Sequence, residues 1–282
     1  MVNQVDFLGA RVSRLILGDN PVHGHTYIPG IVTEAEMLDF FTEQRVMDAV
    51  AEGAASGINT MMPLANEFSF RVIRHYRHTG KPLQVLFQSY PPVDFAVNVR
   101  QMAAFNPIGI YHQGTTTDYL CEQGQFSVLR DRIHMIHDAG FPAGIATHVP
   151  ETILRAEEEN WGCDFYAACL HNARKRMGTD MQESAFITGK PKHIKFYPED
   201  RPLMLSVIGR VQKPCVAFKL FAGGQIFYHQ SEEGVRSALT DALAETFGAI
   251  KPNDVAAIGF FQRDKNQIRE NAEIYCKIRL NP

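Results

Sequence analysis

Short, almost continuously apolar runs alternate along the chain with longer segments in which apolar positions recur at helical spacing. Runs of the first kind are typical of strands that are covered on both faces of a parallel sheet. The strands that this pattern predicts are Arg14–Asp19, Ile58–Pro63, Leu83–Gln88, Ile108–His112, Ala143–Thr147, Asp164–Leu170, Cys215–Leu220 and Val255–Phe260.

The segments between these strands predict helices, and Gly57, Gly80 and Gly140 stand where such helices must end. The predicted helices are Thr42–Ala55, Glu67–His78, Asp94–Phe105, Gln125–Ala139, Pro150–Asn160, Leu203–Val211, Glu232–Phe247 and Asn266–Lys277. Eight strand and helix units are the number that closes a barrel. The sequence therefore predicts an α/β fold, a single (β/α)8 TIM barrel over residues 1–282.

Two connections are longer than the others, and each follows a strand. They are Asn20–Phe41 after the first strand and Asn172–Arg201 after the sixth. Both would lie at the C-terminal face of the barrel, where barrel enzymes carry their active sites. Loops of this length in a compact domain are usually functional, so we expect them to form walls of one pocket.

Composition narrows the classes of partner. A hydrophobic content of 45% over 282 residues is enough for the large core of a barrel. The net charge of −3 argues against nucleic acid or an anionic membrane as the main partner. No basic N-terminal segment precedes an apolar run, and no apolar run has membrane length, so we expect a cytoplasmic protein. The expected partner is a small-molecule substrate, and self-association into a homo-oligomer stays open.

The five cysteines form no CxxC pair, so neither a disulfide framework nor a cysteine-based zinc site is expected. Cys169 and Cys215 lie in predicted strands and Cys163 directly precedes one, and all three are expected to be inert core residues.

Polar residues collect where the predicted strands end. They are Asp19, Asn20, Asn66, Gln88, His112, Gln113, His148, His171, Asn172, Lys219, Gln262 and Arg263. Burying unpaired polar groups is costly, so their concentration at one rim indicates a ligand site. Strand ends are also where solvent begins, and that alternative accounts for some of them.

Histidines are the most informative members of this set. His112, His148 and His171 end three successive strands, and His23 and His25 form an HxH pair beyond the first. Converging neutral imidazoles suit a divalent metal such as Zn²⁺ or Mn²⁺. The predicted ligands are His148, His171, His25 and Glu151. Each histidine taken alone fits a hydrogen-bonded rim residue or a general acid and base equally well.

Lys219 interrupts the apolar run Cys215–Leu220 near its end. A lysine there can polarise a substrate carbonyl, form a Schiff base if burial lowers its pKa, or pair with a rim carboxylate. We expect Lys219 to stabilise an enolate or oxyanion and His112 to transfer protons. The predicted catalytic set is His112, Lys219, Gln113 and Asn20.

Five segments resemble the aldo/keto reductase superfamily, in the same order over nearly the whole chain. They are Val12–Gly18, Met47–Thr60, Gly140–Asn172, Val216–Gly224 and Gln267–Asn271. The resemblance implies a TIM barrel. If NADPH binds, the candidate residues are Gly259, Arg263, Gln267 and Asn271, but the segment between Gly259 and Gln267 is longer than the phosphate-binding loop of the superfamily.

The catalytic residues of that superfamily are mostly missing here. Its members use an aspartate and a tyrosine after strand two, a lysine ending strand three and a histidine ending strand four. Here Met61–Asn66 supplies neither of the first two, strand three ends in Gln88, and only His112 matches. The chain is more similar to uncharacterised bacterial barrels related to the superfamily, which share the segments Gly18–Asn20, Tyr111–Gly114, Gly144–His148, Asp164–His171 and Ala217–Lys219.

Three functions follow as hypotheses. The first is a barrel enzyme acting on a small polar carbonyl or sugar-like substrate by metal-assisted acid and base chemistry, as an isomerase, lyase or hydrolase. The second is an NADPH-dependent oxidoreductase with an altered proton donor, and NADPH is the less expected cofactor. The third is a barrel that binds a ligand without turnover.

Overall fold

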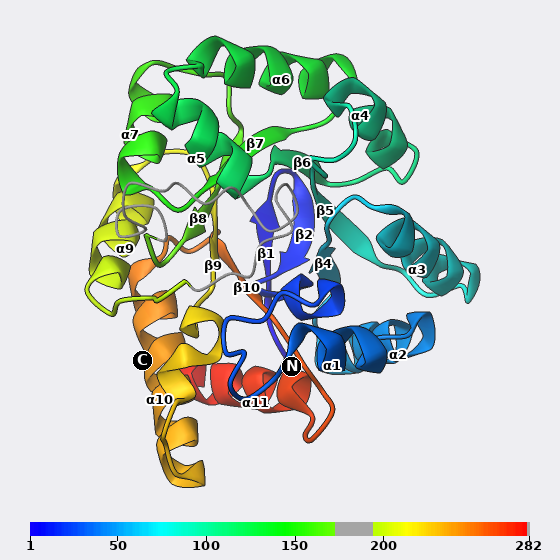
Figure 1. Cartoon of the computed structure of the whole chain (residues 1–282), viewed down its shortest axis with the longest axis vertical. Coiled ribbons are helices and arrows are strands. Elements are labelled where there is room, and N and C mark those ends of the chain that lie inside the picture. Colours follow the sequence, from blue (N-terminus) through cyan, green and yellow to red (C-terminus); the bar gives the residue numbers. More distant parts are fainter. Residues whose placement is uncertain (173–193, 281–282) are drawn as a thin grey trace.

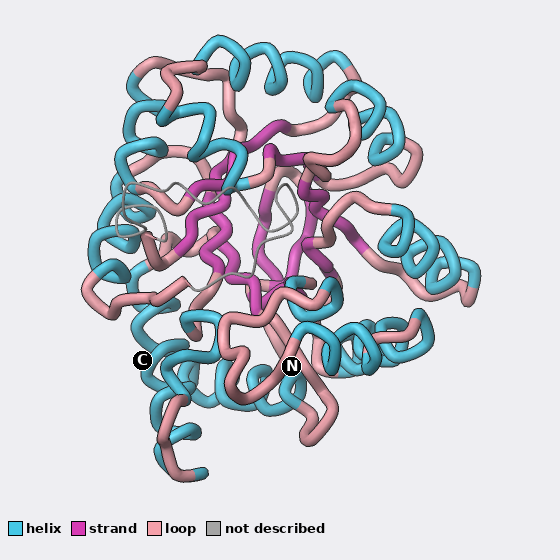
Figure 2. The backbone as a smooth tube through the Cα atoms, viewed as in Figure 1, coloured by secondary structure: helices cyan, strands magenta, loops and turns pink. Residues whose placement is uncertain are grey.

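The computed structural model describes residues 1–172 and 194–280. Eight parallel strands close into a barrel, with β10 hydrogen-bonded to β3 at the closing seam (Figures 1 and 2). The strands are β3 (Leu15–Gly18), β4 (Thr60–Met62), β5 (Gln84–Gln88), β6 (Gly109–His112), β7 (Ala143–Thr147), β8 (Phe165–Cys169), β9 (Cys215–Phe218) and β10 (Val255–Ile258). Each lies within a predicted strand, and the prediction of a TIM barrel is confirmed.

The helices form the outer ring (Figure 2). Those that correspond to predicted helices are α2 (Glu43–Ala55), α3 (Glu67–His78), α4 (Phe95–Ala103), α6 (Phe126–Asp138), α7 (Pro150–Glu158), α9 (Asp200–Arg210), α10 (Glu232–Ala249) and α11 (Gln267–Leu280). Boundaries differ from the prediction by up to three residues, as at the start of α9. No helix in the described ranges has the length and apolar character needed to cross a membrane.

The first long connection contains more regular structure than predicted. The short helix η1 (Asn20–His23) follows β3, and α1 (Glu34–Phe40) begins with a capping box between Thr33 and Glu36. The second connection falls largely on residues 173–193, outside the described part of the chain. Another short helix, η2 (Ala222–Phe227), follows β9.

The apolar pattern does not predict α5 (Gly114–Glu122), which follows β6. Thr115, Thr116 and Thr117 open this helix, and β-branched residues are poor helix formers. Gln113 compensates at the N-terminus, because its side-chain oxygen accepts the backbone N–H of Thr116 at 2.7 Å. Tertiary packing against β7 holds the rest of the helix in place.

A hairpin closes the N-terminal end of the barrel. It consists of β1 (Gln4–Phe7) and β2 (Ala10–Ser13) and lies in the centre of the view in Figure 1. Phe7 packs edge-on against Phe165 of β8, with ring centroids 6.0 Å apart. Val5, Phe7 and Val12 share one buried cluster with strand residues such as Ile16. The hairpin therefore fills the interior at the end opposite the polar rim.

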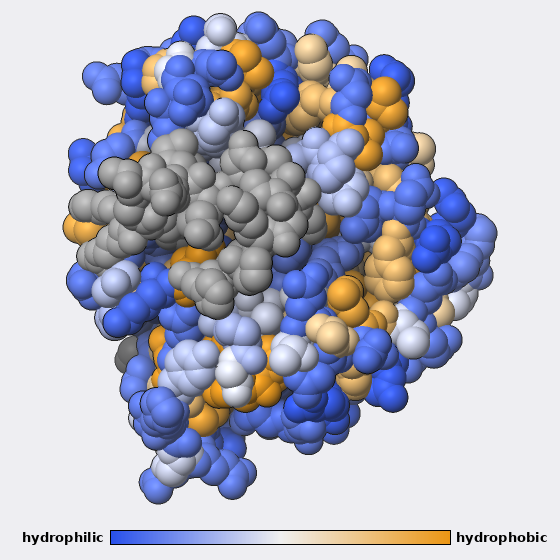
Figure 3. All heavy atoms as spheres, viewed as in Figure 1, coloured by the Kyte–Doolittle hydropathy of each residue, from blue (hydrophilic) through white to orange (hydrophobic). Residues whose placement is uncertain are grey.

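Successive strand residues alternate between two apolar layers. Ile16 of β3 belongs to the cluster inside the barrel, whereas Leu15 and Leu17 pack with the helices outside it. Hydrophilic residues predominate on the face shown in Figure 3, and the apolar residues visible there form separate groups. Most of the burial energy thus comes from the barrel interior and from the layer between strands and helices.

Gly144 of β7 leaves no room for a side chain. A Cβ on this residue would lie 2.7 Å from Cζ of the fully buried Phe165. We expect Gly144→Ala to lower the free energy of unfolding by about 1–3 kcal/mol, as overpacked cores do. The midpoint and slope of urea unfolding measure this change.

Gly248→Ala in α10 is the matched control. A Cβ there meets nothing within 4 Å. Because alanine is the better helix former, this change should raise stability by up to about 1 kcal/mol. Equal unfolding midpoints for the two variants would contradict the assignment of Gly144 to the packed interior.

Candidate active site

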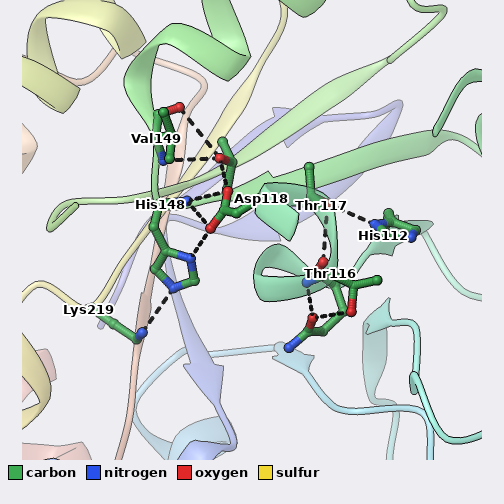
Figure 4. Close-up of polar contacts among 9 residues, drawn as sticks. His112, Thr116, Thr117, Asp118, His148, Val149 and Lys219 are labelled. Carbon is green, nitrogen blue, oxygen red and sulfur yellow. Dashed lines mark hydrogen bonds and ion pairs between the residues drawn. The ribbon is translucent and has the colours of Figure 1, made fainter. Parts of the chain in front are cut away.

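Three charged or polar side chains form a connected row at the C-terminal rim. Nζ of Lys219, just after β9, lies 3.1 Å from Nε2 of His148, just after β7. Nδ1 of the same imidazole lies 2.7 Å from Oδ2 of Asp118 on α5 (Figure 4). Each imidazole nitrogen therefore has a partner, and Asp118 orients the ring toward Lys219.

Asp118 is 1% exposed and links α5, on which it lies, to the C-terminal end of β7. Its Oδ1 accepts a hydrogen bond from the Thr147 hydroxyl, and its carboxylate also lies 3.3 Å from the backbone N–H of His148. Gly114 lets α5 approach the end of β7 closely, because a Cβ there would be 3.3 Å from Cε1 of His148. The carboxylate is thus fully hydrogen-bonded, which makes its burial tolerable.

The backbone at Lys219 departs from the strand. Ala217 packs in the outer layer and Phe218 against the inner cluster, so regular alternation would direct Lys219 outward. Its φ is instead +60°, an unfavourable value for a residue with a side chain. Strain of this kind is often stored at functional sites. Here the strained backbone brings the ammonium to His148.

Aromatic rings surround the Lys219 ammonium. Nζ lies 4.7 Å from the ring centroid of Tyr27, 5.1 Å from that of Phe196 and 5.8 Å from that of Phe218. Tyr27 comes from the first long connection and Phe196 from the described end of the second. One described residue from each long connection therefore packs against the same ammonium. Gly223 packs under Tyr27, since a Cβ there would lie 2.6 Å from the ring.

The charges of this row are coupled. Burial and the Lys219 cation oppose an imidazolium, but Cys169 and Asp118 outweigh them and raise the pKa of His148 to about 9. Burial likewise lowers the pKa of Lys219, yet Tyr27, Cys169 and Asp118 bring it above its ordinary value. The contact between Nζ and Nε2 is a hydrogen bond only when one nitrogen lends its lone pair. The imidazole has the lower of the two pKa values, so it gives up its proton first as the pH rises, and Lys219 then stays the cation beside a neutral His148.

Cys169 differs from the expectation of an inert core residue. Burial raises the pKa of its thiol, but the neighbouring Lys219 and His148 outweigh this effect, so the pKa is lowered overall. The side chain is fully buried at the end of β8. Cys169 thus contributes to the electrostatics beneath the row, where its negative form would stabilise both cations.

His171 is a second imidazole on the inner side of the rim. It is 1% exposed, and its Nδ1 lies 3.2 Å from the Tyr197 carbonyl oxygen, which fixes the proton on that nitrogen. Burial lowers the pKa of His171 to about 4, so the ring is neutral. Its Nε2 has no hydrogen-bond partner among the described residues. His171 and Lys219 both pack on Phe196, with distances of 5.2 Å and 5.1 Å to the ring centroid.

His112 is separated from this row. Figure 4 shows its ring beside Thr117, away from His148 and Lys219. Its Nδ1 lies 2.7 Å from the Thr117 hydroxyl, and Arg132 donates to its Nε2 at 2.6 Å. Burial and the Arg132 cation lower the pKa of His112 to about 3. With both nitrogens engaged, His112 is not placed to transfer protons at Lys219.

The other two predicted catalytic residues also lie outside the row. The side-chain oxygen of Gln113 caps α5, and its backbone N–H donates to the Ser89 hydroxyl at 3.0 Å. Asn20 begins η1, and its carbonyl accepts the backbone N–H of His25 at 3.0 Å. The contacts of both residues support local structure. Of the predicted catalytic set, the row contains Lys219 alone.

The predicted metal ligands are not brought together. Lys219 and Asp118 occupy the nitrogens of His148, and Glu151 is exposed in the first turn of α7. The His25 ring packs beside that of His23, with centroids 6.4 Å apart. In residues 1–172 and 194–280 no three His, Cys, Asp or Glu side chains form a group that could hold a metal ion. Metal binding stays a prediction.

Two of the four residues predicted to bind a nicotinamide cofactor, Arg263 and Gln267, are engaged in local contacts. Arg263 is exposed and pairs with Asp264 at 3.0 Å and Glu36 at 3.1 Å. The Gln267 side chain accepts the backbone N–H of Phe261 at 2.8 Å. All four residues follow β10 or lie in α11: Gly259, Arg263, Gln267 and Asn271. NADPH binding stays a prediction.

The sequence offers Asp118 as one of several candidate carboxylates but does not single it out as the partner of His148, and it gives no signal for Tyr27 or Phe196. Asp118 lies on a helix that the apolar pattern does not predict, and Tyr27 and Phe196 come from irregular connections. An aspartate six residues beyond a rim histidine is a weak signal by itself. Only the packing of α5 against β7 makes Asp118 a partner of His148.

No protein-family model and no curated protein matches the sequence. Solved structures share its fold. Dihydropteroate synthase from Yersinia pestis superposes with a TM-score of 0.53 at 9% identity, covering 99% of this chain and 98% of that one. A truncated 3-deoxy-D-arabino-heptulosonate 7-phosphate synthase from Thermotoga maritima has a TM-score of 0.56 at 9% identity, covering 99% and 91%.

A third similar structure is 3-dehydroquinate dehydratase from Geobacillus kaustophilus. Its TM-score is 0.53 at 11% identity, and the match covers 100% of this chain and 99% of that one. At identities this low the likeness shows a shared barrel fold and nothing about chemistry. The resemblance to aldo/keto reductases stays a prediction.

Asp118→Asn tests the row directly. The substitution removes a negative charge beside Nδ1, so the pKa of His148 should fall from about 9 by one unit or more. Nitrogen-detected NMR titration of the imidazole measures it. Asp131→Asn, at an exposed position on α6, is the control and should leave the titration unchanged. A His148 pKa that is the same in Asp118→Asn would contradict the assigned contact.

His112 should make stability depend on pH. Its pKa is about 3 when folded and near 6.5 when unfolded, so between these values only the unfolded chain binds the proton. Stability is unaffected above that window and falls as the pH decreases through it. His112→Gln should flatten the decrease between pH 6 and 4, by up to about 1.4 kcal/mol per pH unit.

Urea unfolding at several pH values gives the slopes. His78→Gln, at an exposed position on α3, is the control and should keep the wild-type slope. An unchanged slope in His112→Gln would show that the buried imidazole does not carry this dependence.

Proposed function

We propose that the protein is an enzyme that forms a Schiff base between Lys219 and a small hydroxylated carbonyl compound. One observation carries the proposal: Nζ of Lys219 lies 3.1 Å from an imidazole nitrogen of His148 that Asp118 orients. A lysine nucleophile needs a nearby base to remove its proton. The raised pKa of His148 makes its neutral form, which is populated from about pH 9 upward, a stronger base than an ordinary imidazole.

The chemistry balances without any other group. The Lys219 ammonium passes one proton to His148, and the resulting amine adds to the carbonyl carbon. The carbonyl oxygen takes up that proton from His148, and the second proton lost by nitrogen leaves with it as water. A protonated imine and one water result, so the charge is conserved and His148 ends as it began.

The imine supplies the catalytic advantage. A protonated imine withdraws electrons from the neighbouring carbon, which eases loss of a proton or cleavage of a bond there. His148, once neutral, has a free lone pair on Nε2 with which to accept that proton. Reactions of this kind belong to lyases and isomerases.

His171 supports the hydroxylated character of the substrate. Its buried Nε2 is an acceptor that no described residue satisfies. Leaving such an atom unpaired costs about 1–3 kcal/mol, which a substrate hydroxyl would recover by donating to it. His171 and Lys219 contact the same Phe196 ring, so one small molecule could engage both.

A second candidate uses the same residues without a covalent bond. The pKa of Lys219 is raised, which favours the ammonium. As a cation it would stabilise an enolate or oxyanion while His148 removes a proton. The two candidates differ in whether a bond to Lys219 forms, and a trapping experiment separates them.

Reductive trapping is the test. The protein is incubated with glycolaldehyde, dihydroxyacetone or pyruvate in the presence of cyanoborohydride, and adducts are located by peptide mass spectrometry. We expect one adduct per chain, on Lys219. His148→Gln should slow its formation at pH 9, where the imidazole is about half neutral, by about 100-fold, the usual contribution of a positioned base.

Lys219→Arg keeps the positive charge, cannot form an imine and should lose the adduct. Lys277→Arg, at an exposed position on α11, should keep it. Far-UV circular dichroism confirms that each variant is folded. Adducts spread equally over surface lysines, or labelling that survives in Lys219→Arg, would overturn the Schiff base and leave the non-covalent candidate.

A further inference from the structure

A cavity lies between the β5–α4 connection and α6, away from Lys219 and His148. Its volume is about 430 Å³, within the range of small-molecule sites. The segment 89–94 after β5, the start of α4, the end of β6 and one face of α6 form its walls. Neither Lys219 nor His148 lines it, so it is distinct from the candidate active site.

Arg132 is the cationic group that faces this cavity from α6. Its Nη1 donates to Nε2 of His112 at 2.6 Å, and its guanidinium lies 5.1 Å from the ring centroid of Phe95. No carboxylate of the described residues lies within the 4 Å of an ion pair. The buried His112 is neutral, so the one hydrogen-bond partner of this cation among those residues carries no charge.

A guanidinium has five N–H donors in a planar fork, and Arg132 uses one of its nitrogens. The remaining donors lie beside a cavity, over an aromatic ring. This arrangement suits a carboxylate, which binds a guanidinium through two parallel hydrogen bonds. His112 then has a clear role, since it holds Arg132 in place without neutralising it.

Two carboxylates also line the cavity, Asp94 and Asp131, and both are exposed. One oxygen of Asp94 caps α4 by accepting the backbone N–H of Val97 at 3.0 Å. The two carboxylates and the Arg132 cation together give the lining a net charge of −1. This charge disfavours a ligand that carries only a negative charge. A ligand that also carries a cationic group avoids this repulsion, because the cationic group can pair with one of the carboxylates.

The remaining lining is largely apolar. Phe95, Val128 and Met135 line the cavity together with Pro91 and Pro92. This part of the wall accepts an aliphatic or aromatic group, while Ser89, Tyr90 and Thr116 add hydroxyl groups elsewhere in the lining. The cavity therefore presents one site for a carboxylate, one for a cation and one for an apolar body.

We propose that this cavity binds a small zwitterion of the amino-acid type with an apolar side chain. Arg132 binds its carboxylate, Asp94 or Asp131 binds its ammonium, and Phe95 and Val128 contact the side chain. The proposal is independent of any Schiff base at Lys219, because none of these residues belongs to the row around that lysine.

Three probes that share one phenyl group separate the contributions. They are L-phenylalanine, 3-phenylpropionate, which lacks the ammonium, and 2-phenylethylamine, which lacks the carboxylate. Titration calorimetry, with saturation-transfer NMR for weak binding, should show phenylalanine binding at least 10-fold more tightly than either of the others, since each charged contact contributes a factor of this order.

Variants locate the binding. Arg132→Gln should weaken phenylalanine binding at least 10-fold. Arg130→Gln is the matched control, since Arg130 is on the same helix, has a side chain 43% exposed and does not line the cavity. Asp94→Asn keeps the helix cap and, combined with Asp131→Asn, should weaken phenylalanine while leaving 3-phenylpropionate unchanged or tighter.

Equal affinity for phenylalanine and 3-phenylpropionate would overturn the zwitterion. Wild-type affinity in a folded Arg132→Gln would overturn the site. No binding of phenylalanine at 20 mM, about the limit of weak specific recognition, would overturn the proposal as a whole. If Arg132→Gln does not fold, the double aspartate variant and the probe series still decide.

Discussion

A buried carboxylate holds the rim of this barrel together. Asp118 is 1% exposed and accepts hydrogen bonds from both the side chain and the backbone of the β7 end. An unpaired carboxylate at this depth would cost several kcal/mol, so α5 and β7 must stay in register for the fold to be stable. The same contact orients His148. Stability and the geometry of the candidate active site therefore depend on one interaction.

Barrel closure brings the remaining partners to that carboxylate. Because all eight strands are parallel, residues distant in sequence end at one rim, and His148 and Lys219 meet across β8. The approach needs a departure from regular structure, since Lys219 reaches the imidazole with a φ of +60°. Tyr27 and Phe196 then enclose the ammonium, which strengthens its electrostatic interactions.

Two adjacent residues of α5 contact two separate histidines. Asp118 faces His148 inside the barrel, and the neighbouring Thr117 contacts His112 outside it. The alternation of side chains along each strand explains why the two histidines face opposite sides of the barrel wall. Tyr111 belongs to the inner cluster, so His112 points outward, whereas His148 follows Ala146 of the inner cluster by two residues. Histidines that look equivalent in the sequence thus have opposite surroundings and different chemistry.

The sequence by itself determines the barrel and the order of its strands, because apolar runs separated by helical segments leave few other arrangements. It also identifies the rim, and with it Lys219 and His148. It cannot determine which way each rim residue faces, since strands that are apolar on both sides carry no alternating pattern. Tertiary packing decided that Asp118 pairs with His148 and that His112 lies apart from them. Both outcomes depend on which side of its strand each residue faces and on α5, a helix that its own sequence specifies only weakly.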